Sequence, residues 1–392
     1  MKIAHIARTF SRSAWGGTET VVANLVREQR HRGADARVFA TRALWSGVED
    51  SSDDATYYPY LYPYIPLPRA DRLALDHKGG SPYAPSLFRA VRKFRPDVIH
   101  VHCGGRLAQA AVQCARRLGI PSVISLHGGC AEVPKAELDE MLRPLRGKFP
   151  WGGIVDRFVG LRFDPVAEAD AVLAISKSEV EKLRARLPGH LINYLPNGVP
   201  EFVPTTCPRE RGSRKIVCVS RIDYQKNQLA LVDLLAARPE VTVTLVGGVT
   251  AAWYRDRILA RVDELGVADR FRLVPGLPPG SAELEAAFTE ADAFILPSVH
   301  EPFGIVALEA LQRGVPLIAA NVGGIPDFVR DGENGLLFDP GRAGALLQVW
   351  DRFVSESSSV RAARVIAGVE TASRYRWSRI VADLSEIYER VS

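Results

Sequence analysis

The sequence alternates short apolar runs with longer segments of helical periodicity along most of its length. Ile3–Ala7 precedes the helical segment Thr18–Arg32, and Arg106–Leu118 precedes the apolar run Ile120–Leu126. A chain that returns to a short buried strand after each helix favours parallel strands, because each connection crosses a face of the sheet. We therefore predict an α/β protein with doubly wound, Rossmann-like sheets that carry helices on both faces.

The same local pattern occurs once in each half of the chain. Glu168–Ala171 precedes an apolar run that ends in Ser176, and Glu290–Ala293 precedes one that ends in Ser298. An acid pair, a strand and a serine at matching places are what two similar strand-helix domains would show. The match is short, so it supports two domains without establishing them.

Length and composition agree with two domains of ordinary size. A chain of 392 residues can bury two cores. The segment 193–213 is rich in proline, glycine and charge, which is typical of a linker. We therefore expect a first domain over residues 1–200 and a second over residues 201–374.

The charge and cysteine content exclude several classes of protein. The net charge of +5 is mild and argues against a dedicated nucleic-acid binder. The five cysteines are scattered and lack a CxxC pair, so they read as reduced residues of a cytoplasmic protein. The N-terminal apolar run is too short for a signal peptide, and no apolar stretch is long enough to span a membrane.

The stretch from His300 to Leu311 predicts a functional helix. After Gly304 its only polar residue is Glu309, which indicates a buried helix that begins near Gly304. Glu301 lies just before it, and eight helical residues rise about 12 Å. Two acids so spaced suit two contacts on one elongated polar ligand, and the helix N-terminus between them favours phosphate. The alternative is an ordinary N-terminal acid plus a glutamate in a local ion pair.

Two cations follow the first strand of the second half. The buried run Lys215–Ser220 leads directly into Arg221, and Lys226 lies at the following strand-to-helix junction. Together they can neutralise a diphosphate, the arginine through its fork and the lysine as a point charge. The alternative is two exposed loop cations.

The loop after the first strand ends in Gly16 and Gly17, at the start of a helix. Two glycines there allow the backbone to approach an anion closely, although an ordinary tight turn is an equal alternative. The loop is not the GxGxxG fingerprint, so a nicotinamide cofactor is not indicated.

His127 ends a strand and is followed by glycines, at the edge where ligands of open α/β sheets bind. His100, His102 and Cys103 look superficially like metal ligands. Histidines two apart on a strand simply share a face, and no second cluster completes a four-ligand set. A metal site is therefore not expected.

The segment from Glu301 to Glu309 resembles the donor-sugar motif of retaining glycosyltransferases of the GT-B fold, specifically glycosyltransferase family 4. Ser220–Arg221 followed by Lys226–Asn227 is similar to the pyrophosphate site of that family. The resemblance covers nearly the whole chain. It implies two Rossmann-like domains facing a central cleft that holds the site, with a C-terminal helix of about residues 375–392 that packs back on the first domain.

The resemblance also implies roles for individual residues. Glu301 would orient the transferred sugar, Glu309 would hold the ribose, and the diphosphate would lie against Arg221 and Lys226. His127 would face the donor sugar, although the family's usual next residue is an aspartate and this chain has Gly128. The residues expected to be catalytic are His127, Glu301, Arg221 and Lys226. The residues expected to bind the nucleotide-sugar donor are Gly16, Gly17, Asn197, Gly276, Phe303, Gly304, Ile305 and Glu309.

Two segments could recognise the acceptor. Residues 57–66 alternate tyrosine and proline, which suits an extended loop that either stacks on an acceptor or covers the domain surface. Residues 130–164 are acidic at first and then basic and aromatic. They could form an acceptor lid, a solvated helical hairpin or, through 143–163, a peripheral contact with an anionic membrane.

Together, the residue patterns and the resemblance predict a cytoplasmic enzyme that transfers a sugar from a nucleoside-diphosphate sugar to a hydroxyl group of an acceptor, with retention of the anomeric configuration. No DxD motif is present to hold a metal ion on the diphosphate, so neither metal nor cofactor is expected. The acceptor is expected to be a small soluble molecule such as an aminocyclitol or a sugar. Alternatives are a glycolipid or cell-envelope sugar transferase at the membrane surface, a non-catalytic nucleotide-sugar-binding scaffold, and an epimerase or phosphorylase.

Overall fold

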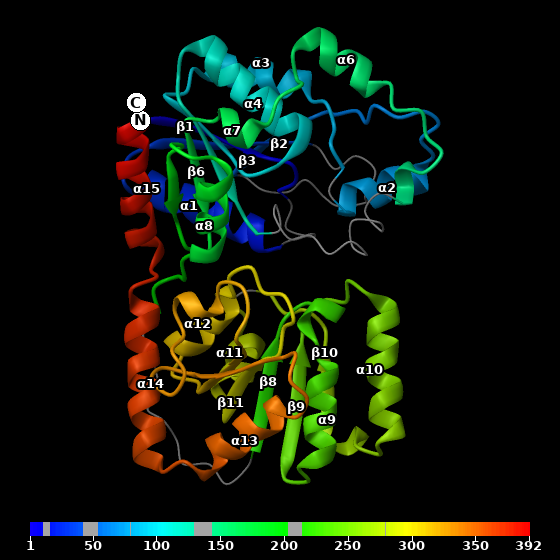
Figure 1. The fold of residues 1–392 in the computed structure, drawn as a ribbon, viewed down its shortest axis with the longest axis vertical. Helices are drawn as coiled ribbons and strands as arrows, with labels where there is room; N and C mark the ends of the chain where they lie inside the picture. Colours follow the sequence, from blue (N-terminus) through cyan, green and yellow to red (C-terminus); the bar gives the residue numbers. More distant parts are fainter. Residues whose placement is uncertain (11–15, 42–53, 79, 129–142, 203–213, 279) are drawn as a thin grey trace. The chain divides into compact units, whose positions relative to one another are not determined.

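The structure is a computed structural model, and it describes residues 1–10, 16–41, 54–78, 80–128, 143–202, 214–278 and 280–392 (Figure 1). The chain divides into two compact units. The first unit contains Met1–Asn197 and Trp377–Ser392, and the second contains Gly198–Arg376. The sequence had placed these boundaries after residues 200 and 374.

The first unit is built on a parallel sheet of seven strands in the order β3-β2-β1-β4-β5-β6-β7. Its strands are β1 (Lys2–Ala7), β2 (Asp35–Thr41), β3 (Ala55–Tyr58), β4 (Val98–Val101), β5 (Ser122–Leu126), β6 (Ala171–Ala174) and β7 (Ile192–Tyr194). All residues of β4, β5 and β6 are buried. Strands that are buried on both faces carry continuous apolar runs, which is why the sequence showed no alternation here.

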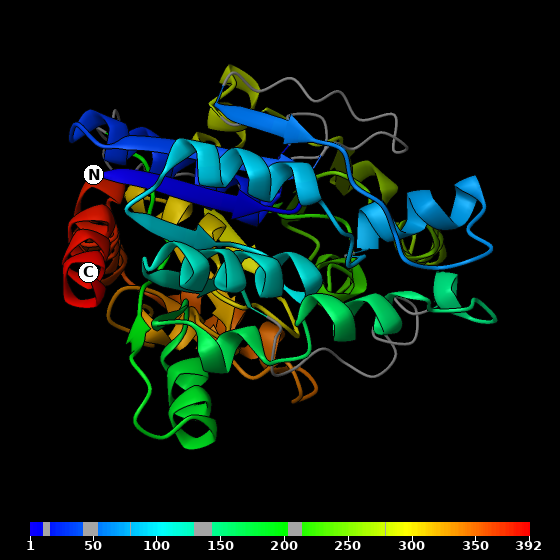
Figure 2. The same ribbon diagram turned by 90° about the horizontal axis from the view of Figure 1, so that it is seen from above.

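Helices cover both faces of this sheet. The helical segments are α1 (Gly17–His31), α2 (Arg69–Lys78), α3 (Pro85–Phe94), α4 (Gly105–Leu118), η2 (Arg143–Leu145), α6 (Gly152–Val159), α7 (Pro165–Glu168), α8 (Lys177–Arg186) and α15 (Trp377–Val391). In Figures 1 and 2, α3 and α4 lie over one face, and α1 and α15 lie along the other. The C-terminal helix α15 therefore completes the first unit.

The second unit is a parallel sheet of six strands in the order β10-β9-β8-β11-β12-β13. The strands are β8 (Arg214–Val219), β9 (Val241–Val246), β10 (Phe271–Val274), β11 (Ala293–Leu296), β12 (Leu317–Ala320) and β13 (Leu336–Phe338). The helical segments are η3 (Tyr224–Lys226), α9 (Leu229–Ala237), α10 (Ala252–Glu264), η4 (Ala268–Arg270), α11 (Ala282–Thr289), α12 (Ile305–Gln312), η5 (Ile325–Asp327), α13 (Ala345–Ser355) and α14 (Ser358–Ser373). The prediction of two doubly wound α/β domains is confirmed.

Two segments differ from the prediction. The linker was expected to begin at residue 193, but Ile192 pairs with Val172 and residues 192–194 form the edge strand β7. A three-residue strand is too short to show a pattern beside Pro196 and Gly198. The tyrosine-proline segment was expected to be a loop throughout, but Tyr57 and Tyr58 belong to β3, which pairs with β2.

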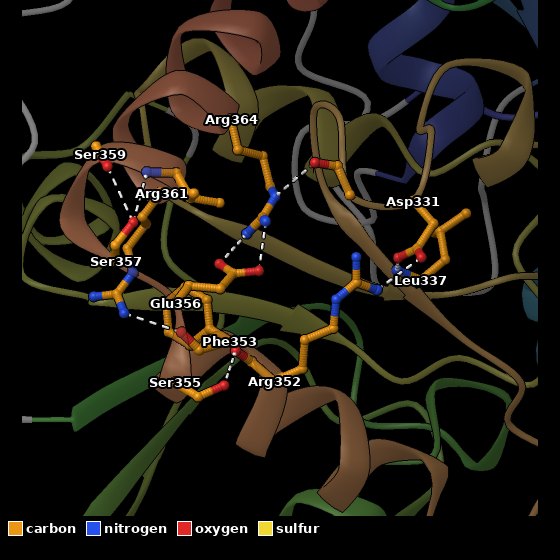
Figure 3. Close-up of polar contacts among 12 residues, drawn as sticks. Asp331, Leu337, Arg352, Phe353, Ser355, Glu356, Ser357, Ser359, Arg361 and Arg364 are labelled. Carbon is orange, nitrogen blue, oxygen red and sulfur yellow. Dashed lines mark hydrogen bonds and ion pairs between the residues drawn. The ribbon is translucent and has the colours of Figure 1, made fainter.

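A polar network ties the last helices of the second unit to a neighbouring loop (Figure 3). The guanidinium of Arg364 is buried and pairs with both carboxylate oxygens of Glu356. Arg352 pairs with Asp331 at 2.8 Å, and Asp331 also accepts a hydrogen bond of 2.9 Å from the amide of Leu337. These contacts fix α13 and α14 relative to the turn before β13.

In the part of the chain that the structure describes, no helix is long and apolar enough to cross a membrane.

Candidate active site

Both sheets have a point at which the direction of winding reverses. In the second unit the chain runs from β8 outward to β9 and β10, and then returns to β11 on the other side of β8. In the first unit the same reversal lies between β1 and β4. Loops leave such a point in opposite directions at the carboxyl ends of the strands, and ligands bind there. The predicted site residues lie along these two edges, and we describe each edge separately.

The structure joins two predicted residues of the second unit that are far apart in sequence. Lys226 is the last residue of η3, after β8, and Glu301 follows β11. The Nζ atom of Lys226 donates to the Oε2 atom of Glu301 at 2.7 Å, and their side chains are only 12% and 8% exposed. Ser298 donates to the same oxygen at 3.1 Å. A cation and a carboxylate are thus held together at the switch point, partly shielded from water, where electrostatic interactions are strong.

The loop before α12 is shaped by glycines. Gly304 has a φ of +91°, and a Cβ atom on it would lie 2.4 Å from the side chain of Ile325. Gly323 has a φ of +56°, and a Cβ atom there would lie 1.9 Å from the carbonyl oxygen of Glu301. The ring of Phe303 is buried as an anchor. The loop therefore holds Glu301 in a fixed place beside the first amide groups of the helix, which lack intrahelical partners.

α12 begins at Ile305, as the apolar run predicted, and carries Glu309 one turn before its end. Burial raises the pKa of the Glu309 carboxyl, and the neighbouring Arg313 opposes this rise. Arg313 directs its guanidinium to Glu285 at 2.8 Å and to the backbone oxygen of Glu309 at 2.9 Å. Among the described residues, no ion pair engages the Glu309 carboxylate. A local ion pair of a glutamate was the alternative to ligand binding that the sequence left open. Such a pair is present at Glu301, and its partner is Lys226, which was expected to bind the diphosphate.

Arg221 lies at the end of β8 with an exposed side chain. Its backbone is held by Gln228, which is fully buried and donates to the carbonyl oxygen of Arg221 at 2.7 Å and to Ser220 at 3.0 Å. Sequence reasoning missed Gln228, although a polar residue directly after Lys226–Asn227 was a usable signal. Gly276, after β10, lies against the neighbouring loop, since a Cβ atom on it would be 3.1 Å from the amide nitrogen of Gly248.

In the first unit, Gly16 caps α1 and Gly17 is its first residue. The amide of Gly16 donates to Glu19 at 3.1 Å, and Thr9 donates to the same carboxylate at 3.0 Å. A Cβ atom on Gly17 would meet no described atom within 4 Å. The next two residues, Thr18 and Glu19, line a cavity of about 290 Å³ that extends to the ends of β1 and β4, where it is lined by Arg8, His102 and Gly105 among others. Such a cavity suits a small polar ligand.

His127 directly follows β5 and takes part in a network with histidines on or next to β1 and β4. Its Nε2 atom lies 3.0 Å from the Nδ1 atom of His102, whose Nε2 atom lies 2.9 Å from the Nδ1 atom of His5. His100 bonds Tyr388 of α15 at 2.6 Å and Ser125 at 2.7 Å. Burial lowers the pKa of His5 and of His127 to about 4, so both rings are neutral at neutral pH.

Sequence reasoning missed His5 in this network. The sequence does place His5 on a predicted strand of the sheet. It does not show that His5 lies opposite His100, because that pairing depends on the order of the strands.

The remaining predicted residues lie outside this network. Cys103 has a pKa raised to about 12 by burial, so its thiol is protonated at neutral pH. Asn197 is buried as the last residue of the first unit's main segment. The acids of 132–140 lie outside the described residues.

Comparison with known proteins supports a glycosyltransferase. A family model described as "Glycosyl transferases group 1" matches residues 208–367, and one described as "Glycosyltransferase Family 4" matches residues 15–201. A D-inositol 3-phosphate glycosyltransferase of Acidothermus cellulolyticus is 30% identical over an alignment of 407 positions, which covers 95% of this chain and 85% of that protein. A glycogen synthase of Mycobacterium tuberculosis is 30% identical over 311 residues, covering 76% of this chain and 69% of that one.

Solved structures share the fold. The HepE protein of Anabaena, solved with UDP and glucose, has a TM-score of 0.70 at 20% identity and full coverage of both chains. A glycosyltransferase of Rickettsia africae has a TM-score of 0.72 at 14% identity, covering 100% of this chain and 98% of that one. The strand order, the two reversal points and the sequence relationship agree, and the chain belongs to glycosyltransferase family 4, with the GT-B fold.

Proposed function

We propose that this glycosyltransferase moves a sugar from a nucleoside-diphosphate sugar to a hydroxyl of a small soluble acceptor, with retention of configuration and without a metal ion. The observation that supports it most is the shielded pair of Lys226 and Glu301 beside the N-terminus of α12. HepE, which shares the fold, was solved with UDP-glucose, which supports a nucleotide-sugar donor.

The second unit supplies groups suited to such a donor. The negative charge of a diphosphate is neutralised by Arg221 and Lys226, and its oxygens accept hydrogen bonds from the free amide groups at the start of α12. When Lys226 forms an ion pair with the diphosphate, the carboxylate of Glu301 is released from Lys226 and accepts hydrogen bonds from hydroxyls of the sugar. Glu309 accepts hydrogen bonds from the ribose. Among the described residues, no other ion pair of the chain links two of the predicted site residues.

In the reaction, the bond between the anomeric carbon and the phosphate oxygen breaks, and the acceptor oxygen bonds to the same face of that carbon. The acceptor proton passes to the departing phosphate oxygen, and the products are the glycoside and the nucleoside diphosphate. Arg221 and Lys226 stabilise the charge that develops on the leaving group, which is the role a metal ion fills elsewhere. His127 keeps the role that the family resemblance implies for it.

Thermal unfolding with a panel of nucleoside diphosphates and their sugars tests the donor. A ligand at a hundred times its dissociation constant adds about 2.7 kcal/mol of stability, so one base should raise Tm clearly. Loss of this rise in Arg221→Met, whose side chain is exposed, assigns the effect to the diphosphate site. Anomeric NMR of the product and turnover after chelation test retention and metal independence. No stabilisation by any nucleotide would refute the donor, and binding without donor hydrolysis would support a scaffold instead.

One surface favours a second candidate, a transferase that acts on a lipid-linked acceptor. On α6 the side chains of Ile154 and Phe158 are 56% and 84% exposed, and Phe149 before it is 61% exposed. Arg146 and Arg157 are exposed in the same segment. Apolar side chains beside cations suit the surface of an anionic membrane. Co-sedimentation with vesicles of anionic and of neutral lipid decides between the candidates, with Phe158→Ser as the variant.

A further inference from the structure

The histidines of the first unit form a continuous chain of hydrogen bonds that ends at a glutamine. The Oε1 atom of Gln29, on α1, lies 2.7 Å from the Nε2 atom of His5. From His5 the chain runs to His102 at 2.9 Å and on to His127 at 3.0 Å. Each ring uses a different nitrogen for each neighbour, so the chain is linear and passes through β1 and β4 to the end of β5.

Each ring of this chain is neutral at neutral pH. Burial lowers the pKa of His5 and of His127 to about 4, and it lowers the pKa of His102 well below its usual value. A neutral imidazole has one nitrogen that donates and one that accepts. The hydrogen bond at one nitrogen therefore determines the state of the other.

The orientation of the Gln29 amide sets the direction of the chain. Its nitrogen faces the hydroxyl of Tyr388 at 3.4 Å, and its oxygen faces His5. An amide oxygen only accepts, so the Nε2 atom of His5 carries hydrogen and its Nδ1 atom accepts. The Nε2 atom of His102 then donates to His5, and by the same reasoning the Nε2 atom of His127 donates to His102.

The side branch of the network agrees with this direction. The hydroxyl of Tyr388 accepts from Gln29 and can therefore donate to the Nδ1 atom of His100 at 2.6 Å. The Nε2 atom of His100 then donates to the hydroxyl of Ser125 at 2.7 Å. With the Gln29 amide in this orientation, every contact of the network pairs one donor with one acceptor.

We propose that Gln29, His5 and His102 are positioning residues that hold His127 in its Nε2–H tautomer, so that the Nδ1 atom of His127 accepts a hydrogen bond from a ligand hydroxyl. This Nδ1 atom is buried and has no hydrogen-bond partner in the ranges that the structure describes. A phosphate or carbonyl oxygen would face it lone pair to lone pair. The inference deepens the proposed function, on which it rests, by naming the residues that set the tautomer of His127.

A metal ion is the rival explanation for three clustered histidines. His5, His100 and His102 each offer a nitrogen within 4.8 Å of the others. A metal would need a free lone pair from each ring at about 2.0–2.1 Å. In the hydrogen-bond chain, however, both ring nitrogens of His5 and both ring nitrogens of His102 already take part in hydrogen bonds of 2.7–3.0 Å. The tautomer chain uses these nitrogens fully, and the test below separates the two explanations.

The test is long-range proton–nitrogen NMR of the full-length protein with ¹⁵N-labelled histidine, which distinguishes the two neutral tautomers from imidazolium and from a metal-bound ring. The expected spectrum shows the Nε2–H tautomer for His5, His102 and His127. In Gln29→Met the His127 signals should change to a mixture or to the Nδ1–H tautomer. Gln29→Glu, which restores an acceptor oxygen, should restore Nε2–H. Ser125→Ala, in the side branch, is the matched control and should leave His127 unchanged.

Several results overturn the proposal. The first is that His127 of the unmodified protein shows the Nδ1–H tautomer. The second is that the protein binds one equivalent of metal ion per chain. The third is that Gln29→Met folds and the His127 signals do not change. The first two need no variant, so the proposal is tested even if the variant does not fold.

A binding comparison links the tautomer to the ligand. Gln29→Met should weaken binding of the stabilising nucleotide sugar by up to about tenfold, the loss expected for one hydrogen bond. Binding of the matching nucleoside diphosphate, which lacks the sugar, should not change. Equal weakening of both ligands contradicts the positioning role. If the tautomers are as expected but no nucleotide sugar binds, the proposed function fails, together with the assignment of the ligand hydroxyl, while the tautomer chain stands.

Discussion

Replacing Lys226 by methionine should reduce the stability of the second unit and the affinity for a nucleoside diphosphate together, whereas replacing Arg221 should reduce only the affinity. Lys226 pairs with Glu301 at 2.7 Å, with side chains that are 12% and 8% exposed. Removing one partner leaves a shielded carboxylate with only the hydroxyl of Ser298, and breaking a buried pair costs about 3–5 kcal/mol. Arg221 is exposed, so its loss should change stability by no more than about 0.5 kcal/mol.

Two measurements separate these effects. Amide hydrogen exchange of the peptide that contains β11 reports the stability of the second unit without requiring the whole chain to unfold in one step. Calorimetric titration with the stabilising nucleoside diphosphate reports the affinity, which should fall by about 10- to 100-fold in each variant, since a hydrogen bond to a charged group contributes about 1.5–3 kcal/mol. The double variant Lys226→Met with Glu301→Gln should recover part of the stability. Unchanged exchange in Lys226→Met, or equal destabilisation by Arg221→Met, would refute the reasoning.

Three further outcomes follow from the structure. Glu356→Ala leaves the buried guanidinium of Arg364 unpaired and should cost about 3–5 kcal/mol in urea unfolding; a loss below 1 kcal/mol contradicts a buried pair. Glu309→Gln should stabilise the free protein above pH 5, since burial raises the pKa of Glu309 and a raised carboxyl pKa lowers stability as pH rises, while nucleotide affinity falls; denaturation and titration on one sample check both. Stability should decline as pH falls from about 6.5 to 4, because the unfolded chain protonates His5 and His127 first, and His5 alone contributes roughly 3 kcal/mol from its pKa of about 4; a flat profile in this window contradicts the buried neutral rings.

The sequence predicted the parts of the fold that depend on local pattern. The apolar run after Gly304 predicted α12 because a helix buried around most of its circumference has few polar residues. The strand-helix alternation predicted parallel sheets because no short connection can join parallel strands. Pattern failed at β7, where three residues are too few to show a period and only the neighbouring strand makes them extended.

The sequence also predicted which residues lie at the carboxyl edges, but not their contacts. Lys226 and Glu301 were assigned to different parts of a ligand, and their ion pair across 75 residues depends on β11 lying beside β8. The network of His5 likewise depends on β4 lying between β1 and β5. Alternation gives the face of a strand that a residue occupies, whereas the strand order gives its partners.

The second unit begins and ends at the same place in space. The amide of Val199 donates to the carbonyl oxygen of Tyr375 at 2.7 Å, and Val199 forms a parallel bridge with Arg376. Its two ends leave side by side, and α15 then returns the chain to the first unit. In evolution, such a unit can be exchanged as a whole for that of a related protein, because its two junctions with the first unit lie in neighbouring segments of the chain. Under the proposed function, exchanging this unit between family members would exchange the donor-binding groups, provided that the C-terminal helix is inherited with the first unit.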